Sequence, residues 1–277
     1  MTATPQAAAP RHVTAPSLMR AAIRTLSLLA PPLAVRAAAR LFRYPIRPRN
    51  ESFSGQRFAL RVRNHTVRGG VRGEGRLVIL AHGWGGSESQ FDALADSLLG
   101  RGFRVVTFSA IGHGASTGRF SSMVEFRDSL RAVASHFGEP HAIVGHSLGG
   151  AASALAVSEG LHTNRLVLIA PSGHPQRYLD LFLDWLEFPE SLRGRVMQHF
   201  EKVLRFAWQR LDIEAFGPLV NARALIIHDR GDREVPWSEG ADVARAIPGA
   251  ELVSVETLGH RRILRDAQVI ERVANFI

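Results

Sequence analysis

Cysteine is absent from this sequence, and lysine and tyrosine are scarce. Among its 277 residues there is no cysteine, one lysine (Lys202) and two tyrosines. The absence of cysteine excludes disulfide bonds, thiolate metal sites and a cysteine nucleophile. Arginine carries the remaining positive charge almost alone, which indicates a GC-rich coding bias more than selection for phosphate binding.

Acidic residues are absent from the first 50 positions, and this asymmetry accounts for most of the net charge of +9. The same stretch holds eight arginines: Arg11, Arg20, Arg24, Arg36, Arg40, Arg43, Arg47 and Arg49. Subtracting them leaves a net charge of +1 for residues 51–277. A nearly neutral body argues against a nucleic-acid partner, because binding nucleic acid needs a basic patch on the folded domain.

Metal and nucleotide motifs are missing as well. The twelve histidines are scattered, and no H-x-x-H or H-E-x-x-H spacing occurs among them. No G-x-G-x-x-G or G-x-x-x-x-G-K sequence is present. We therefore expect neither a metal ion nor a nucleotide cofactor.

Long uncharged apolar runs are also lacking. Residues 17–43 are apolar and basic, but this segment is too short and too charged for a spanning helix. Arginines and prolines interrupt it: Arg24, Pro31, Pro32, Arg36 and Arg40. On a helix, Arg36, Arg40 and Arg43 would share one face. Three roles stay open: a leader helix that packs on the body, a peripheral contact with an anionic membrane, or a targeting sequence.

Apolar runs alternate with amphipathic segments along the rest of the chain. Alternating apolar and polar residues predict two half-exposed strands within 53–71, with a turn at Asn64–His65. Apolar runs predict further strands at 77–81, 105–108, 142–144, 166–170, 225–227 and 252–255. Helical spacing of apolar or small residues predicts helices at 90–99, 123–137, 150–157 and 269–277. This order predicts an α/β fold with a mostly parallel central sheet and helices on both faces.

Residues 172–220 interrupt that alternation. They are helical in pattern and rich in aromatic side chains: Phe182, Trp185, Phe188, Phe200, Phe206 and Trp208. We interpret this stretch as an inserted helical cap. Its aromatic side chains would either pack in the core of the cap or line an apolar pocket for an acyl chain.

A G-x-S-x-G motif stands between a predicted strand and a predicted helix. Its residues are Gly145-His146-Ser147-Leu148-Gly149. The chain must reverse sharply here, and the flanking glycines let the backbone and the neighbouring helix approach closely. The turn lifts the Ser147 hydroxyl clear of the sheet and places the Leu148 N–H at a helix N-terminus. We therefore predict that Ser147 is a nucleophile.

A serine hydroxyl needs a base and an orienting acid to become a nucleophile. Asp232 lies on the loop after a predicted strand, where open α/β sheets place their sites. We favour it as the acid over Asp229 and Glu234. His260 follows the last predicted strand and completes the chain order Ser, Asp, His, so we predict it as the base.

An oxyanion hole needs two backbone donors. The Leu148 N–H is one candidate. The other should come from the glycine-rich loop His82–Ser87, and we predict the N–H of Trp84. The alternative for this loop is a tight turn with a packed tryptophan.

Together these motifs resemble the α/β-hydrolase superfamily, and within it the capped serine esterases of bacteria. The resemblance is carried by residues 145–150, the His82-Gly83-Trp84-Gly85 loop, Asp232 before Val235-Pro236, and Gly259-His260. It covers about residues 55–277 and implies Ser147 as nucleophile, Asp232 as acid, His260 as base, and Trp84 and Leu148 as oxyanion donors. One departure stands out, because many relatives have Asp-x-Pro-Gly-His-Gly-x-Ser where this chain has Ser109 and Ile111 at the Asp and Pro places. The conformation of that loop is therefore an open question.

We accordingly divide the chain into a basic N-terminal arm (1–50), the first part of a hydrolase core (51–171), a helical cap (172–220) and the second part of the core (221–277). We expect a serine hydrolase that cleaves carboxylic esters with short to medium acyl chains through an acyl-enzyme. A lipase, a thioesterase or another acyl hydrolase at a membrane surface stays open, as does a non-catalytic binding protein with this fold. We expect a small-molecule substrate, a monomer or homodimer, and a cytoplasmic protein that associates with membranes if residues 17–43 contact lipid.

Overall fold

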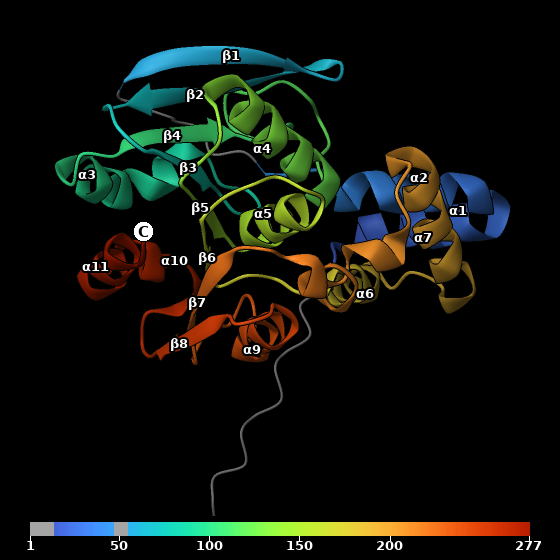
Figure 1. The fold of residues 1–277 in the computed structure, drawn as a ribbon. Helices are drawn as coiled ribbons and strands as arrows, with labels where there is room; N and C mark the ends of the chain where they lie inside the picture. The colour runs from blue at the N-terminus through green and yellow to red at the C-terminus, as the bar shows by residue number, and fades with distance from the viewer. Residues whose placement is uncertain (1–13, 47–54) are drawn as a thin grey trace, which may run out of the picture. The chain divides into compact units, whose positions relative to one another are not determined.

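A computed structural model describes residues 14–46 and 55–277 of the chain (Figure 1). The ends of the predicted basic arm, 1–13 and 47–50, lie outside the described residues, as does the start of the predicted strand region at 53–54. The described residues form two compact units. One contains the chain up to Phe42 together with Gln176–Val203, and the other contains Arg43–Pro175 and Leu204–Ile277.

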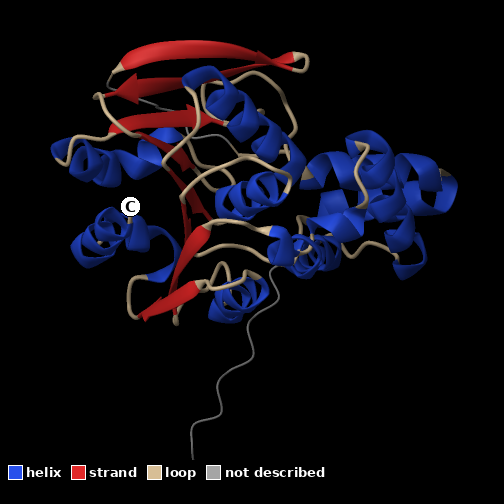
Figure 2. Ribbon diagram, viewed as in Figure 1, coloured by secondary structure: helices blue, strands red, loops and turns tan. Residues whose placement is uncertain are grey.

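The larger unit is built on one eight-stranded sheet (Figure 2). Its strands are β1 (Gln56–Val62), β2 (His65–Arg72), β3 (Leu77–Ala81), β4 (Arg104–Ser109), β5 (Ala142–His146), β6 (Arg165–Ile169), β7 (Arg223–Asp229) and β8 (Glu251–Val255). Their spatial order is β1-β2-β4-β3-β5-β6-β7-β8. The pairs β1–β2 and β2–β4 are antiparallel, and all others are parallel. The predicted mostly parallel sheet is confirmed.

Helices cover both faces of this sheet (Figure 1). The main ones are α3 (Asp92–Gly100), α4 (Met123–Phe137), α5 (Leu148–Ser158), α9 (Trp237–Ala246) and α11 (Ala267–Phe276). Helices α3 and α11 contact each other on one face, while α4 and α5 contact each other on the opposite face. The central strands are buried on both sides, which explains why β3 and residues 142–144 of β5 are continuous apolar runs rather than alternating ones.

Short helices lie in the connections of the larger unit. They are η1 (Glu88–Phe91), η2 (Trp208–Leu211), α8 (Ile213–Phe216), η3 (Gly217–Leu219), α10 (Gly259–Arg262) and η4 (Ile263–Arg265). A continuous apolar core joins the sheet to α3 and α11 through side chains such as Leu80, Leu98, Val144, Leu225 and Val273. This core fixes the strands whose ends carry the predicted site.

Four helices form the smaller unit: α1 (Ser17–Leu29), α2 (Pro31–Phe42), α6 (Pro175–Trp185) and α7 (Glu190–Leu204), apart from a residue or two at the ends of α6 and α7. The Phe42 ring packs against Phe182 and Phe200, with centroid distances of 5.3 and 5.7 Å. The prolines interrupt this segment, as their position in the sequence predicted: α1 ends at Leu29 and α2 begins at Pro31. The boundaries of the cap, 172–220, remain a prediction.

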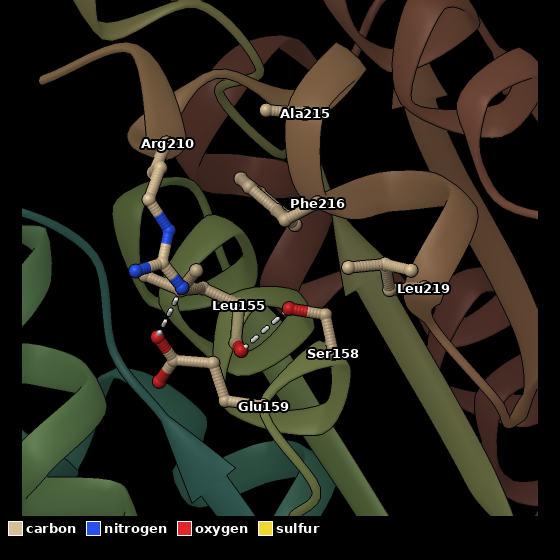
Figure 3. A pocket seen from close by; sticks show the side chains of 7 residues that line it. All are labelled: Leu155, Ser158, Glu159, Arg210, Ala215, Phe216 and Leu219. Carbon is tan, nitrogen blue, oxygen red and sulfur yellow. Dashed lines mark hydrogen bonds and ion pairs between the residues drawn. The ribbon is translucent and has the colours of Figure 1, made fainter. Parts of the chain in front are cut away.

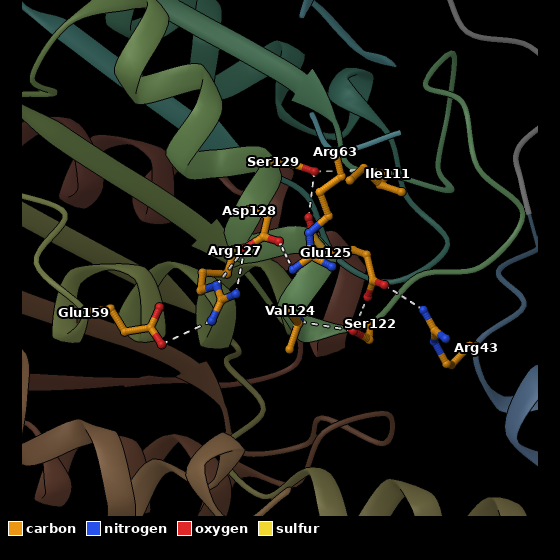
Figure 4. A network of polar contacts seen from close by, with 10 residues as sticks. All are labelled: Arg43, Arg63, Ile111, Ser122, Val124, Glu125, Arg127, Asp128, Ser129 and Glu159. Atoms are coloured by element: carbon orange, nitrogen blue, oxygen red, sulfur yellow. Dashed lines mark hydrogen bonds and ion pairs between the residues drawn. The ribbon is translucent and has the colours of Figure 1, made fainter. Parts of the chain in front are cut away.

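Two details differ from the sequence-based expectations. The turn between the first two strands is formed by Arg63 and Asn64, because His65 already pairs with Val62 as the first residue of β2. Arg63 has a φ of 53°, the left-handed conformation that such a tight turn requires. Arg43 does not share a helical face with Arg36 and Arg40, since α2 ends at Phe42. The Arg43 guanidinium instead forms an ion pair of 2.6 Å with Glu125 on α4 (Figure 4).

None of the helices in the described ranges is long and apolar enough to cross a bilayer.

Candidate active site

The predicted serine, aspartate and histidine follow three strands of the same parallel set. Ser147 follows β5, Asp232 lies three residues after β7, and His260 lies five residues after β8. Parallel strands present their carboxyl ends at one edge of the sheet, and open α/β sheets bind ligands at that edge. The topology therefore places all three side chains at the same edge.

Ser147 has a strained backbone. Its φ of 52° and ψ of −123° lie in a region that residues with a side chain rarely occupy. Close packing holds it there: a Cβ on Gly145 would lie 2.6 Å from the Gly149 carbonyl oxygen, and one on Gly149 would lie 2.2 Å from the His82 carbonyl oxygen. The chain reverses between β5 and α5 in the way that the G-x-S-x-G motif predicts.

Asp232 and His260 are joined by a hydrogen bond. The His260 Nδ1 lies 2.7 Å from Asp232 Oδ2, and both side chains are almost completely buried. The other carboxylate oxygen, Oδ1, accepts hydrogen bonds from the backbone N–H groups of Glu234 and Val235 at 2.8 and 2.9 Å. The carboxylate is thus fixed from two sides, and it holds the histidine with Nδ1 protonated and Nε2 available as an acceptor.

His228 is a second histidine on the same carboxylate, and sequence reasoning missed it. It is completely buried; its Nε2 lies 3.0 Å from the Val235 carbonyl oxygen and 3.4 Å from Asp232 Oδ2. Burial alone would raise the pKa of Asp232, but hydrogen bonds from His228, His260 and the Val235 N–H together lower that pKa well below its usual range. Asp232 is therefore ionised across the neutral range. The only signal in the sequence was a histidine at the end of an apolar strand.

The two other acid candidates have different partners. Asp229 accepts hydrogen bonds from the backbone N–H groups of Gly231 and Leu258, both at 2.7 Å, so it ties the β7 loop to the β8 loop. Glu234 forms an exposed ion pair with Arg261. The structure brings only Asp232 among these three carboxylates into hydrogen-bond contact with His260.

His146 links the serine turn to the loop of His260. Its ring lies 4.6 Å from the His260 ring, centroid to centroid, and its Nε2 donates to the His260 carbonyl oxygen at 3.0 Å. Burial, together with the nearby His260, lowers the pKa of His146 to about 3, so it stays neutral. Within the described residues the Ser147 hydroxyl makes no hydrogen bond to His260. In a free enzyme this contact is often long, and it shortens when substrate binds.

The predicted oxyanion donors lie on the loop after β3 and at the start of α5. Leu148 is the first residue of α5, a position whose N–H has no partner inside the helix. Trp84 lies in a turn closed by a hydrogen bond from the Gly86 N–H to the Gly83 carbonyl oxygen. Next to it, buried His82 donates from Nδ1 to the Gly83 carbonyl oxygen and accepts from the Ala110 N–H at Nε2. Burial lowers the pKa of His82 to about 4, so the ring stays neutral and keeps the tautomer protonated at Nδ1.

The unusual loop at 109–116 is held by local hydrogen bonds. The Ser109 hydroxyl donates to the carboxylate of Glu88, and both side chains are buried. The Ile111 N–H donates to the Ser129 hydroxyl at 3.1 Å, and that hydroxyl donates to the Glu125 carbonyl oxygen (Figure 4). A carboxylate from η1 and a hydroxyl from α4 therefore fix the loop in which Ser109 and Ile111 replace the usual Asp and Pro.

A separate cavity of about 300 Å³ lies at the far end of α5 (Figure 3). Leu155, Phe216 and Leu219 form part of its wall, and Arg210 approaches Glu159 to 3.9 Å beside it. None of the predicted site residues lines this cavity. It is therefore distinct from the sheet edge that carries Ser147.

The aromatic side chains of 172–220 have several environments. Phe188, Phe200 and Trp208 are buried, so they belong to cores rather than to an open pocket wall. Phe206 instead lies between two guanidinium groups, those of Arg127 and Arg210, at 5.1 and 4.9 Å from its ring centroid. For these four side chains, core or cation–π packing is the observed role.

His174 is on the loop that follows β6, and its ring lies between the side chains of Asp212 and Asp242. Its Nδ1 is 3.0 Å from Asp212 Oδ2, and its Nε2 is 3.3 Å from Asp242 Oδ2. Burial opposes the charged form, but the hydrogen bond and charge of Asp212, the hydrogen bond of Asp242 and the charge of Glu239 together raise the pKa of His174. Both ring nitrogens can donate only when the ring is protonated. This arrangement therefore favours the imidazolium.

We expect His174 to make stability depend on pH. Because its folded-state pKa is raised, its contribution is fully present below the unfolded pKa of about 6.5 and is lost as the pH rises through the folded pKa. The difference in Tm between the wild type and His174→Gln should be larger at about pH 5.5 than at about pH 8.5. Thermal melts of both proteins measure it, and a gap that does not change with pH would contradict the assignment.

The sheet order, the strained turn at Ser147 and the helices on both faces define the fold as that of the α/β-hydrolases. The family model described as "Serine aminopeptidase, S33" matches residues 74–260, and the chain belongs to this family of α/β-hydrolases. Membership makes the chain a hydrolase. The bond that it cleaves is not fixed by membership alone.

Known proteins support the same class. The chain is 24% identical over 240 residues to the AB hydrolase superfamily protein YisY of Bacillus subtilis, covering 72% of this chain and 90% of that protein. It is 23% identical over 249 residues to the bifunctional esterase/perhydrolase DCH of Acinetobacter calcoaceticus, covering 71% and 89%. A thermophilic esterase from Thermogutta terrifontis has the same fold, with a TM-score of 0.60, 18% identity and coverage of 80% of this chain and 97% of that one.

Proposed function

We propose that this protein is a serine hydrolase that cleaves carboxylic esters with short to medium acyl chains. One observation carries the proposal: buried Asp232 holds His260 at 2.7 Å, at the sheet edge where the strained turn presents Ser147. A protein that only bound ligands would need neither an ionised carboxylate behind the histidine nor a strained serine. The combination is what nucleophilic catalysis by a serine requires.

In the proposed reaction Ser147 Oγ attacks the ester carbonyl carbon while His260 Nε2 takes the hydroxyl proton. Asp232 stabilises the imidazolium that forms, and the N–H groups of Leu148 and Trp84 stabilise the oxyanion. The tetrahedral intermediate expels the alcohol, which receives the proton from His260 and leaves an acyl-enzyme on Ser147. Water then attacks the acyl carbon, His260 takes its proton, and the carboxylic acid leaves as Oγ regains a proton.

The names of relatives guide the choice of substrate. The Acinetobacter relative is an esterase and perhydrolase, and human monoglyceride lipase is 32% identical over 104 residues, 34% of this chain. Esters are therefore the first substrates to examine. The family description names an aminopeptidase, so an aminoacyl p-nitroanilide belongs in the same series. Oligomeric state and cellular location remain predictions.

The test is covalent labelling with a fluorophosphonate, read by intact mass, for the wild type and Ser147→Ala. We expect one adduct on the wild type and none on the variant, with kcat for p-nitrophenyl esters lower by about 10⁴-fold or more in the variant. Circular dichroism shows whether the variant is folded. A folded wild type without adduct or turnover would favour a non-catalytic binding protein, and turnover of the anilide alone would move the activity to amides.

A further inference from the structure

Helix α1 presents an apolar stripe to solvent. Leu18, Ala22, Thr25 and Leu29 follow one another at intervals of four, three and four residues, and all four are exposed. Leu18 and Leu29 are 84% and 81% exposed, and neighbouring Leu28 is 78% exposed. The buried positions of the helix are Ile23 and Ser27. The side toward solvent is thus at least as apolar as the side toward the protein, the reverse of an ordinary surface helix.

Helix α2 adds positive charge that is not neutralised. Its exposed positions include Leu33, Arg36 and Arg40, which share one face at intervals of three and four residues. Arg36 and Arg40 form no hydrogen bond or ion pair with any described residue, whereas Arg20 and Arg24 both pair with Glu187. No acidic residue occurs between positions 14 and 46. The free charge of this segment is therefore purely positive.

The two helices form one hairpin, residues 17–42, because only Ala30 separates them and they contact each other. We propose that this hairpin binds the surface of an anionic phospholipid bilayer. Exposed leucines that are costly to leave in water would enter the boundary between headgroups and acyl chains. Arg36 and Arg40 would bind the phosphate groups of anionic lipids.

The charge pattern selects lipid over a second copy of the chain. In a symmetric dimer the same surface meets itself, so unpaired arginines without neighbouring acids would face each other. An anionic bilayer offers phosphates for the arginines and an apolar layer for the leucines at the same time. Neither helix is long enough to cross a bilayer, so the hairpin would lie in the plane of the interface.

Co-sedimentation with vesicles tests this surface. The full-length protein is mixed with vesicles of phosphatidylcholine alone or of equal parts phosphatidylcholine and phosphatidylglycerol, at low and high salt. We expect the wild type to bind the anionic vesicles. Leu18→Ser with Leu29→Ser should weaken that binding about tenfold or more. Arg36→Gln with Arg40→Gln should weaken it about 30-fold at low salt, and much less at high salt.

Matched controls come from exposed residues of the larger unit. Leu219→Ser, at a leucine 64% exposed, and Arg61→Gln, at an exposed arginine on β1, should leave vesicle binding unchanged. Because all of these side chains are exposed, the variants should keep the circular dichroism spectrum of the wild type. Hydrolysis of soluble esters should also persist in the hairpin variants, so failure of the docking proposal and failure of the proposed reaction are distinguishable.

Three results would overturn the proposal. The first is a folded wild type that does not sediment with anionic vesicles. The second is binding that the hairpin variants and the control variants change equally. The third is a wild type that does not bind vesicles but is a dimer in solution, and whose dimer dissociates in Leu18→Ser with Leu29→Ser. That result would assign the leucine stripe to contact between two copies.

Discussion

Asp232→Asn is expected to lower kcat for ester hydrolysis by about 10⁴-fold in a protein that remains folded. Asparagine can still accept the backbone hydrogen bonds of Glu234 and Val235 through its carbonyl oxygen, so the loop keeps its shape. Its amide nitrogen, however, would then face His260 Nδ1 as a donor. That contact favours the tautomer with Nε2 protonated, which cannot take the proton of Ser147. KM should change far less than kcat, because Asp232 acts through His260.

Asp229→Asn and Glu234→Gln are the matched controls for this prediction. Asp229 binds two backbone N–H groups and is completely buried, so its replacement should lower Tm. It should lower kcat far less than Asp232→Asn does. The Glu234 side chain forms an exposed ion pair with Arg261, and Glu234→Gln keeps the backbone N–H that binds Asp232, so this variant should change neither Tm nor kcat appreciably. Steady-state kinetics and thermal melts of all three variants decide the matter. A large loss of kcat in Asp229→Asn with normal activity in Asp232→Asn would show that the acid is Asp229.

Gly149→Ala is expected to destabilise the fold by about 3 kcal/mol or more and to abolish activity. A Cβ at this position would lie 2.2 Å from the His82 carbonyl oxygen and 2.4 Å from the Ala81 carbonyl oxygen. Both are backbone atoms at the end of β3, so they cannot rotate away. Either α5 must move off the sheet or the strand must shift, and both movements displace the Leu148 N–H and the turn at Ser147. Each kcal/mol should lower Tm by about 2–4 °C.

Gly100→Ala provides the control for the glycine series. Gly100 ends α3 in the same unit, and a Cβ there would meet nothing within 4 Å. Alanine should therefore stabilise the protein by about 0.5–1 kcal/mol, because it reduces the freedom of the unfolded chain. The effect of Gly150→Ala on stability should lie between those of Gly149→Ala and Gly100→Ala, since a Cβ at Gly150 would lie 3.2 and 3.3 Å from its nearest neighbours. An unchanged Tm and full activity in Gly149→Ala would contradict the close packing that we assign to the turn.

Local sequence patterns predicted much of the fold because they report on the immediate environment of each residue. The apolar runs 77–81 in β3 and 142–144 in β5 indicated strands buried on both faces. The alternating pattern before them indicated a strand pair with one exposed side. The glycines at 145 and 149 indicated a close approach of backbone to backbone, which the structure confirms. The order of Ser147, Asp232 and His260 along the strands was sufficient to place them at one edge of the sheet.

Contacts between distant segments were beyond the reach of the same patterns. Glu88 as the partner of Ser109 and His228 as a second donor to Asp232 depend on which strands and helices become neighbours. Arg43 was expected to share a helical face with Arg36 and Arg40, but the tertiary structure pairs it with Glu125 on α4.

The hairpin of α1 and α2 shows most clearly which features come from the sequence and which come from tertiary packing. Its leucines, arginines and lack of acid are properties of the sequence. The sequence allowed a helix in this segment, interrupted at Pro31 and Pro32, but periodicity cannot say which face of a helix with leucines on several sides turns toward the protein. Packing decided that Ile23 and Ser27 are buried and that Leu18 and Leu29 are exposed. The sequence by itself determined the elements and the order of the site residues, whereas tertiary packing decided which faces and which polar partners meet, because those depend on the whole chain at once.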